Sequence, residues 1–323
     1  PKKYPVAHSL ADSGNADMRV ALRGNLRKPG EIAPRRFLRI LAGEDPTRFK
    51  QGSGRIELAD AVVGEGRRLT ARVWVNRLWQ GHFSKALVDS PSNFGRLGSL
   101  PTHPGLLEWL AARLVRGNWS TKAMHRLIVS SSTYQMGSQF VSASFSVDGG
   151  NRLYWRMSPR RLDVESWRDA LLHVTGELSG QIGGGPDEQV RGSRRRTLYF
   201  SVSRHGDRFE TDKFLRLFDF PVPRATIAKR AVSVVPQQYL FLMNSAFMID
   251  RAKAFAARIG VVSMENDERI RHAYRLLYSR LPTDDELQIG RTFLAQAQVQ
   301  KGLTPWEQYS QTLLSANEFM YLR

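Results

Sequence analysis

Cysteine is absent from this chain of 323 residues. Without it, these residues can form no disulfide, thiol nucleophile, zinc–thiolate site or covalent c-type haem attachment. Long apolar runs are missing as well, because the longest candidate, residues 232–249, is interrupted by Pro236, Gln237, Gln238 and Asn244. A membrane-spanning helix needs about twenty consecutive apolar residues. We therefore expect a soluble chain with no transmembrane segment and no cofactor within it.

Negative charge is scarce relative to positive charge. The chain has 48 lysines and arginines against 30 aspartates and glutamates, a formal net charge of +18. Such a charge should attract polyanions at low salt and lose that attraction as salt screens it. The charge need not serve a ligand, however. Only ten of the 48 basic residues are lysine, so the arginine excess can reflect GC-rich coding, and an acidic region elsewhere in a longer protein could neutralise this surface.

The spacing of apolar residues predicts helices. From Ile56 onward apolar residues recur at intervals of three and four, as in helices that bury one stripe. Ser120 is a predicted N-cap, and Thr283-x-x-Glu286 and Thr304-Pro305-x-Glu307 are predicted capping boxes. Residues 197–202 (TLYFSV) are the best strand candidate. We expect a mainly α fold: an irregular multi-helix assembly with a long N-terminal arm and one or two short strands.

The chain is long enough for more than one packed unit. Residues 1–55 are rich in Pro, Gly and Arg with little periodicity and predict an extended arm. We expect an N-terminal helical unit over 56–140, a break within 135–150, and a C-terminal helical unit over 151–323 packed on the first. The chain begins Pro-Lys-Lys rather than with Met, which suggests a processed product or a fragment.

The densest group of polar and aromatic side chains lies within residues 69–98. Arg72 and Asn76 share one helix face, and Gln80 follows one turn beyond Asn76 and Arg77. A guanidinium beside amides suits bidentate binding of a carboxylate, sulfate or phosphate. The same groups could instead brace neighbouring loops, including the one that carries Asn93, because irregular loops have many backbone groups to satisfy.

Histidines offer only weak catalytic candidates. His82 and His103 could act as a general base, but with His125 they lack the i, i+4 spacing of a zinc-binding helix, and no H-E-x-x-H occurs. We predict no metal site. We also expect Trp79, Trp109 and Trp119 to lie in one N-terminal core.

Charged side chains after residue 160 have two interpretations. Four carboxylates share a predicted helix with arginines, so a salt-bridged surface explains them better than a glycosidase acid pair; they are Asp163, Glu165, Asp169 and Glu177, beside Arg160, Arg161 and Arg168. Farther along, Arg194, Arg195 and Arg196 form a candidate polyanion-binding triplet.

The motifs of this chain resemble one family over nearly the whole length. Three segments carry the clearest signature: RVWVNRLWQGHF at 72–83, LVDSPSNFG at 87–95 and PTHPGLLEWLA at 101–111. They resemble the planctomycete-specific, cytochrome-associated PSD family (domain of unknown function 1553). Asn93 stands where the family has Asp as often as Asn, and Ser84-Lys85 replace a more usual Gly-Arg pair. The resemblance implies an export signal and an upstream region, often with cytochrome c-like domains, and hence an extracytoplasmic location, periplasmic or secreted.

Three functional hypotheses remain open, because the family has no settled activity. The leading hypothesis is a non-catalytic helical module of a larger exported protein, docking or binding a ligand beside redox or polysaccharide-processing partners. The first alternative is a hydrolase or binding protein for an anionic polysaccharide, using a cleft around Arg72, Asn76, His82, Asn93 and His103. The second is non-specific nucleic-acid binding through Arg194–Arg196, without sequence selectivity. Whether the chain is an enzyme is left open.

Overall fold

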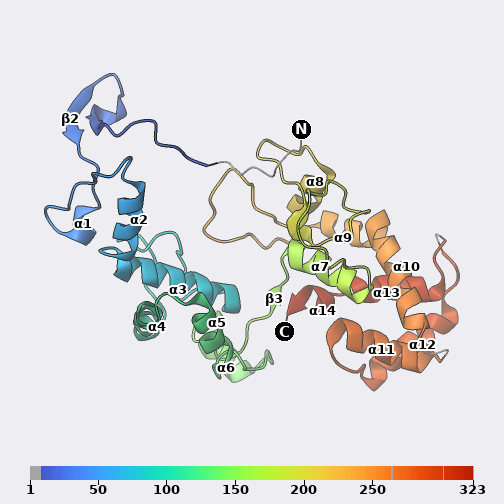
Figure 1. Cartoon of the computed structure of the whole chain (residues 1–323). Coiled ribbons are helices and arrows are strands. Elements are labelled where there is room, and N and C mark those ends of the chain that lie inside the picture. The colour runs from blue at the N-terminus through green and yellow to red at the C-terminus, as the bar shows by residue number, and fades with distance from the viewer. Residues whose placement is uncertain (1–8, 263–264, 301, 323) are drawn as a thin grey trace. The chain divides into compact units, whose positions relative to one another are not determined.

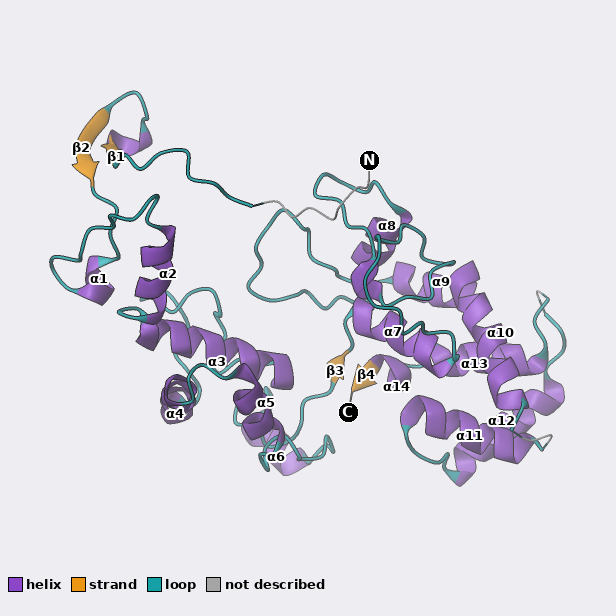
Figure 2. Cartoon of the chain, viewed as in Figure 1, coloured by secondary structure: helices purple, strands orange, loops and turns teal. Residues whose placement is uncertain are grey.

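The computed structural model describes residues 9–262, 265–300 and 302–322 of the chain (Figure 1). Helices dominate these residues: there are 14 α-helices but only two sheets, each of two short strands (Figure 2). The predicted mainly α fold is therefore confirmed. None of the described helices is both long enough and apolar enough to cross a bilayer.

Internal contacts divide the chain into two units, Pro1–Gln135 (unit 1) and Met136–Arg323 (unit 2). In chain order the elements of unit 1 are β1 (Met18–Ala21), the 3₁₀ turn η1 (Leu22–Gly24), β2 (Pro29–Ala33), α1 (Arg39–Ala42), α2 (Arg55–Val63), α3 (Arg67–Phe83), α4 (Pro104–Arg116) and α5 (Thr121–Val129). β1 and β2 pair antiparallel, with Met18 opposite Ala33. The segment expected as an extended arm thus contains a short hairpin, the 3₁₀ turn η1 and the single turn of α1.

The core of unit 1 forms where α3 packs against α4 and α5. α3 buries Ala71, Val75, Trp79 and Phe83, which recur every four residues; α4 contributes Leu107, Leu110 and Leu114, and α5 contributes Met124 and Ile128. Ser120 accepts a hydrogen bond from the backbone N–H of Ala123, so its predicted role as the cap of α5 is confirmed.

Tryptophan placement in unit 1 departs from the prediction. Trp79 is only 5% exposed, whereas Trp109 is 50% exposed and Trp119 is half-buried. The prediction that Trp109 lies in the core is wrong. Leu107, Leu110 and Leu114 already occupy the buried stripe of α4, and position 109 lies well away from that stripe on a helix of 3.6 residues per turn.

Unit 2 continues the chain after Gln135. Its elements are α6 (Ser142–Val147), β3 (Arg160–Arg161), α7 (Val164–Val174), the 3₁₀ turn η2 (Thr197–Tyr199), α8 (Glu210–Leu217), α9 (Pro236–Asn244), α10 (Ala246–Gly260), α11 (Asn266–Tyr278), α12 (Asp284–Gln296), α13 (Pro305–Leu314), α14 (Asn317–Met320) and β4 (Tyr321–Leu322). Both predicted capping boxes are confirmed, at the starts of α12 and α13.

The core of unit 2 is rich in aromatic rings. Trp167 of α7 lies 4.7 Å from the ring of Phe218 and 6.3 Å from that of Phe214, between ring centroids. Phe247 and Phe255 extend the same cluster onto α10. The end of the unit returns to its beginning, because β4 pairs antiparallel with β3 (Figure 2).

The predicted strand at 197–202 is wrong. Residues Thr197–Tyr199 form the 3₁₀ turn η2, and Phe200 makes only an isolated bridge to Asp187. Asp169 of α7 accepts hydrogen bonds from both the backbone N–H and the hydroxyl of Thr197, at 2.7 Å each. This side-chain anchor takes the place of a strand partner, so the β-branched and aromatic residues here pack without a ladder.

A buried arginine holds the loop before η2. Arg168 of α7 is fully buried and forms no ion pair among the described residues; its guanidinium donates to the carbonyls of Val190, Ser193 and Arg195 and to the hydroxyl of Thr197. Burial lowers the pKa of Arg168 to about 10, so the side chain remains charged at neutral pH. The salt-bridged surface role expected for Arg168 is wrong.

Candidate functional site

The signature segment forms most of α3 and the loop that leads to α4. α3 ends at Ser84, which adopts a left-handed conformation with φ of 60° and donates its backbone N–H to the carbonyl of Gln80. The chain then turns, and Leu87 and Val88 are buried. Residues 89–100 that follow are mostly exposed, so the loop is anchored at its start.

Asn76 provides that anchor. It has no exposed surface, its Nδ2 donates to the carbonyl of Val88 at 3.0 Å, and its Oδ1 accepts from the backbone N–H of Val88 at 2.8 Å. One side-chain amide thus supplies both hydrogen-bond partners of the Val88 backbone, which lies buried in an irregular segment.

Arg72 points to a different neighbour. Its Nη2 lies 2.5 Å from Oε1 of Glu108 on α4, and both side chains are substantially exposed. The pair borders a hollow of about 370 Å³ between α3 and α4, with Arg67, Arg68 and Arg116 around it. Four guanidinium groups and one carboxylate give this hollow a positive charge.

Arg77 and Gln80 make no side-chain hydrogen bond or ion pair with the rest of the described chain. Arg77 is exposed and Gln80 is half-buried. Neither side chain is therefore committed to bracing a loop.

Asn93 organises its own loop. Its Oδ1 accepts from the backbone N–H of Gly95 at 3.0 Å, and its carbonyl accepts from the hydroxyl of Ser90 at 2.7 Å. A Cβ at Gly98 would lie 2.1 Å from the carbonyl oxygen of Asn93, so only glycine fits there. No hydrogen bond or ion pair joins Asn93 to Arg72, Asn76 or Arg77 within the described residues, and the bonds of Arg72, Asn76 and Asn93 go to different partners.

The two candidate bases, His82 and His103, contact different residues. Nε2 of His82 is 2.8 Å from Nδ1 of His125 on α5, and the rings of His82 and Tyr134 make a T-shaped contact with centroids 5.6 Å apart. His103 instead precedes α4, with Nδ1 3.0 Å from the hydroxyl of Thr102. Sequence spacing carried no sign of the His82–His125 pair, because 43 residues separate them. Among the described residues no three His, Asp or Glu side chains gather as metal ligands.

Each arginine of the 194–196 triplet faces a carboxylate. The ion pairs are Arg194–Glu177 at 3.5 Å, Arg195–Asp187 at 3.5 Å and Arg196–Asp169 at 3.2 Å. Arg195 also donates to the carbonyls of Gly183 and Gly185, and its guanidinium carbon lies 3.9 Å from the centre of the Tyr199 ring. Arg195 thereby supports the loop over residues 183–185, while the side chains of Arg194 and Arg196 remain mostly exposed.

Comparison with known proteins identifies the family. The family model PSD1, described as a protein of unknown function (DUF1553), matches residues 54–294, about three quarters of the chain. The chain belongs to the PSD1 family. The match crosses the boundary between units 1 and 2, so both units are part of the PSD1 pattern. No curated protein and no solved structure matches the chain.

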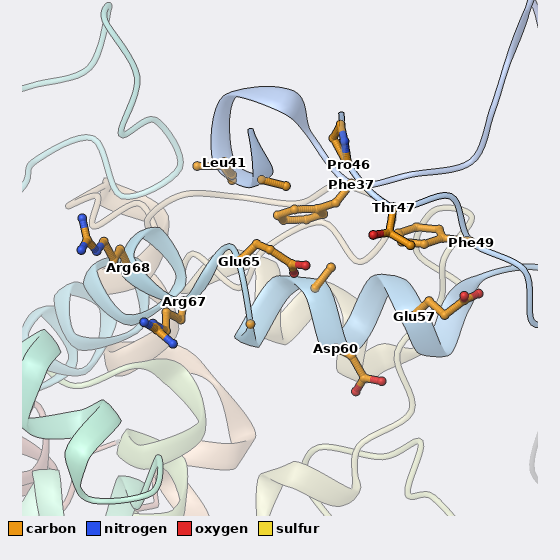
Figure 3. A pocket seen from close by; sticks show the side chains of 13 residues that line it. Phe37, Leu41, Pro46, Thr47, Phe49, Glu57, Asp60, Glu65, Arg67 and Arg68 are labelled. Carbon is orange, nitrogen blue, oxygen red and sulfur yellow. The ribbon is translucent and has the colours of Figure 1, made fainter. Parts of the chain in front are cut away.

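A further hollow in this PSD1 protein lies beside the start of the signature helix. It measures about 900 Å³ and is bordered by α1, α2 and the first turn of α3. Figure 3 shows the rings of Phe37 and Phe49 on one side of it and the carboxylate of Glu65 reaching toward them. The carboxylate of Glu57 accepts backbone hydrogen bonds from residues 50 and 51. None of the described residues that border this hollow was predicted as a site residue.

Proposed function

We propose that this PSD1 protein is a non-catalytic helical module that docks a partner or binds a ligand. The observation that carries the proposal is the use made of Asn76. Both polar atoms of its amide are bonded to the backbone of Val88 in a place with no exposed surface. A side chain that is buried and bonded in this way is not accessible to a substrate.

The setting of the module follows from the family resemblance. We propose an extracytoplasmic location, periplasmic or secreted, within a larger exported and cytochrome-associated system. The partners would be other domains or chains of that system, including redox or polysaccharide-processing components. The excess of positive charge, +18 overall, supports contact with an anionic polysaccharide, and we propose no cofactor for the chain itself.

The role of the signature can be tested by removing the amide. Asn76→Ala deletes two hydrogen bonds and leaves the buried N–H and C=O of Val88 without partners. The free energy of unfolding should fall by about 2–4 kcal/mol. Arg77→Ala is the matched control, one position along the same helix, and should change it by less than about 0.5 kcal/mol.

The measurement is chemical denaturation followed by far-ultraviolet circular dichroism. An Asn76→Ala protein as stable as wild type, but unable to bind what wild type binds, would show that the amide serves a ligand instead.

The second candidate, a hydrolase of anionic polysaccharide, is favoured by one observation. His82 and His125 share a hydrogen bond of 2.8 Å beside Tyr134, and paired titratable groups can divide acid and base roles. Wild type, His82→Gln and His125→Gln should be compared for release of reducing ends from uronic-acid and sulfated polysaccharides. Activity that is lost in both variants would establish the enzyme; no release by wild type would support the module.

A further inference from the structure

A basic hollow lies within unit 2. It measures about 530 Å³ and is bordered by Glu177, which follows α7, by the loop over 189–194 and by α10. α7 and α10 contact each other directly and lie side by side in Figure 1. The charged residues at its edge are Glu177, Arg191, Arg194, Asp250, Arg251 and Lys253. We call it the Arg251 hollow.

Charge is not balanced in the Arg251 hollow. Four cationic side chains face two carboxylates. Arg191 and Asp250 neutralise each other through two contacts, of 2.6 and 3.0 Å, and the guanidinium holds the pKa of Asp250 below its usual range. Glu177 is shared between Arg194 and Arg251. One arginine charge and the charge of Lys253 therefore remain unmatched.

Arg251 itself is incompletely bonded. The residue is 4% exposed, and its Nη1 is buried without a hydrogen-bond partner among the described residues. Its Nε lies 2.9 Å from Oε2 of Glu177 as an ion pair, but without hydrogen-bond geometry. Arginine cannot shed its proton at ordinary pH, so a buried guanidinium with unfilled donors carries a free-energy cost that a further acceptor would relieve.

The shape and lining of the hollow narrow the choice of ligand. Guanidinium groups bind carboxylate, sulfate and phosphate oxygens through paired N–H donors. A volume of about 530 Å³ accommodates more than a bare ion, and pockets of this size suit small organic ligands. The described residues that border the hollow include no aromatic side chain, so it offers no platform on which nucleobases could stack.

We propose that the Arg251 hollow binds an oxyanion-bearing sugar of an anionic polysaccharide, with Arg251, Arg194 and Lys253 contacting the acidic group. The inference rests on the ligand-binding role proposed above and gives that role a place and a ligand class. Nη1 of Arg251 is shielded from water, so a neighbouring side chain has to move before a ligand can reach it. The side chain that moves is that of Arg194, which is long and 66% exposed. Glu177 keeps Arg251 in position until the anion arrives.

The test measures binding by calorimetry on the full chain at about 50 and 200 mM salt. The probes are galacturonate oligosaccharide, heparin oligosaccharide, a neutral oligosaccharide, inorganic phosphate and sulfate, and a random DNA duplex. Carboxylated and sulfated sugars are thereby separated from each other and from free anions. One of the two acidic sugars should bind more tightly than either inorganic anion and the neutral sugar, and should retain this preference at the higher salt.

Variants assign the binding to the hollow. Lys253→Ala and Arg194→Ala both change exposed side chains and should each weaken sugar binding at least tenfold. The matched controls are Lys213→Ala and Arg204→Ala, exposed residues of the same unit that do not border the hollow, and they should leave binding within twofold. Arg251→Lys keeps the charge but loses the planar pair of donors, and should also weaken binding.

The remaining outcomes overturn the proposal. Equal losses in the variants and the controls would mean attraction by net charge alone, and tighter binding of the duplex would make nucleic acid the ligand. Absence of binding to every probe would leave Arg251 as the buried counter-ion of Glu177. None of these results would alter the stability expected for Asn76→Ala, so failure here is distinguishable from failure of the signature's structural role.

Discussion

Units 1 and 2 both fasten an irregular loop to a helix, but they use different side chains. In unit 1 the neutral amide of Asn76 holds the backbone of Val88. In unit 2 the charged guanidinium of Arg168 holds three carbonyls of the loop before η2. Both polar atoms of the amide are hydrogen-bonded, whereas the Nε of Arg168 has no partner among the described residues.

The difference shows where hydrogen-bond donors remain without a partner in this PSD1 protein. The amide of Asn76 is bonded through both polar atoms and has no exposed surface, so a ligand cannot reach it. Buried arginines have five donors each and a charge that persists, and in the described part of unit 2 both Arg168 and Arg251 leave at least one N–H unfilled. Asn76 of unit 1 is therefore bonded internally. Unfilled buried donors occur in both units, at the Nε of Arg72 in unit 1 and at Arg168 and Arg251 in unit 2. Among the described residues, the arginines that combine an unfilled donor with nearly complete burial are both in unit 2.

The largest expected effect concerns the apolar core of unit 1. Trp79→Ala should lower the free energy of unfolding by about 3–5 kcal/mol, because a buried ring is replaced by a cavity. Trp109→Ala removes a half-exposed ring and should cost less than about 1 kcal/mol. Denaturant titration of both variants measures the difference, and equal costs would mean that the two rings are equally buried.

The next effect tests the anchor of unit 2. Arg168→Ala leaves buried carbonyls of the loop without donors and should cost about 2–4 kcal/mol. Arg168→Lys retains the charge but not the fork of donors, and should recover only part of this loss. Hydrogen–deuterium exchange of peptides covering 190–197 should rise in both variants. Exposed Arg204→Ala is the control, and an unchanged loop in Arg168→Ala would refute the anchor.

The smallest effect is the response of unit 2 to acid. Arg280 donates two hydrogen bonds of 2.7 Å to Glu286, and these lower the pKa of Glu286 to about 2, from an ordinary value of 4.5. A carboxyl with a lowered folded pKa stabilises the protein fully above its unfolded pKa, and this stabilisation is lost as pH falls from about 4.5 toward 2. Because Glu286 is partly exposed, we expect roughly 1 kcal/mol.

Glu286→Gln isolates that contribution. Its stability should depend less steeply on pH than that of wild type between about pH 4.5 and 2.5, as measured by thermal unfolding. Identical slopes in the two proteins would place the acid sensitivity elsewhere. Glu188→Gln, an exposed carboxylate with no hydrogen bond or ion pair to the described residues, should leave the slope unchanged.

Much of the fold could be predicted because its signals are local. Apolar spacing and the caps at Ser120, Thr283 and Thr304 depend on residues three or four positions apart, and the structure confirms these caps. The strand expected at 197–202 failed because Asp169, 28 residues away, holds Thr197. The predicted burial of Trp109 was wrong because apolar character alone does not tell which face of a helix is buried.

The candidate site was harder to predict, because its decisive contacts are distant in sequence. Asn76 and Val88 are close enough along the chain for a bracing role to be foreseen as one of two options. The pairing of His82 with His125, and of Arg251 with Glu177, joins residues more than forty positions apart. Nothing in the local pattern of Arg251 marks it as buried, since arginine is usually exposed.

Amide hydrogen exchange at Val88 tests the central claim most directly. The account predicts that the Val88 N–H exchanges slowly in wild type, because Asn76 accepts it in a place without exposed surface. In Asn76→Ala it should exchange at least about tenfold faster, while the backbone N–H of Leu110 in the core of α4 accelerates much less. Rapid exchange of Val88 in wild type, or no change in the variant, would contradict the conclusion that the signature residue Asn76 supports the fold.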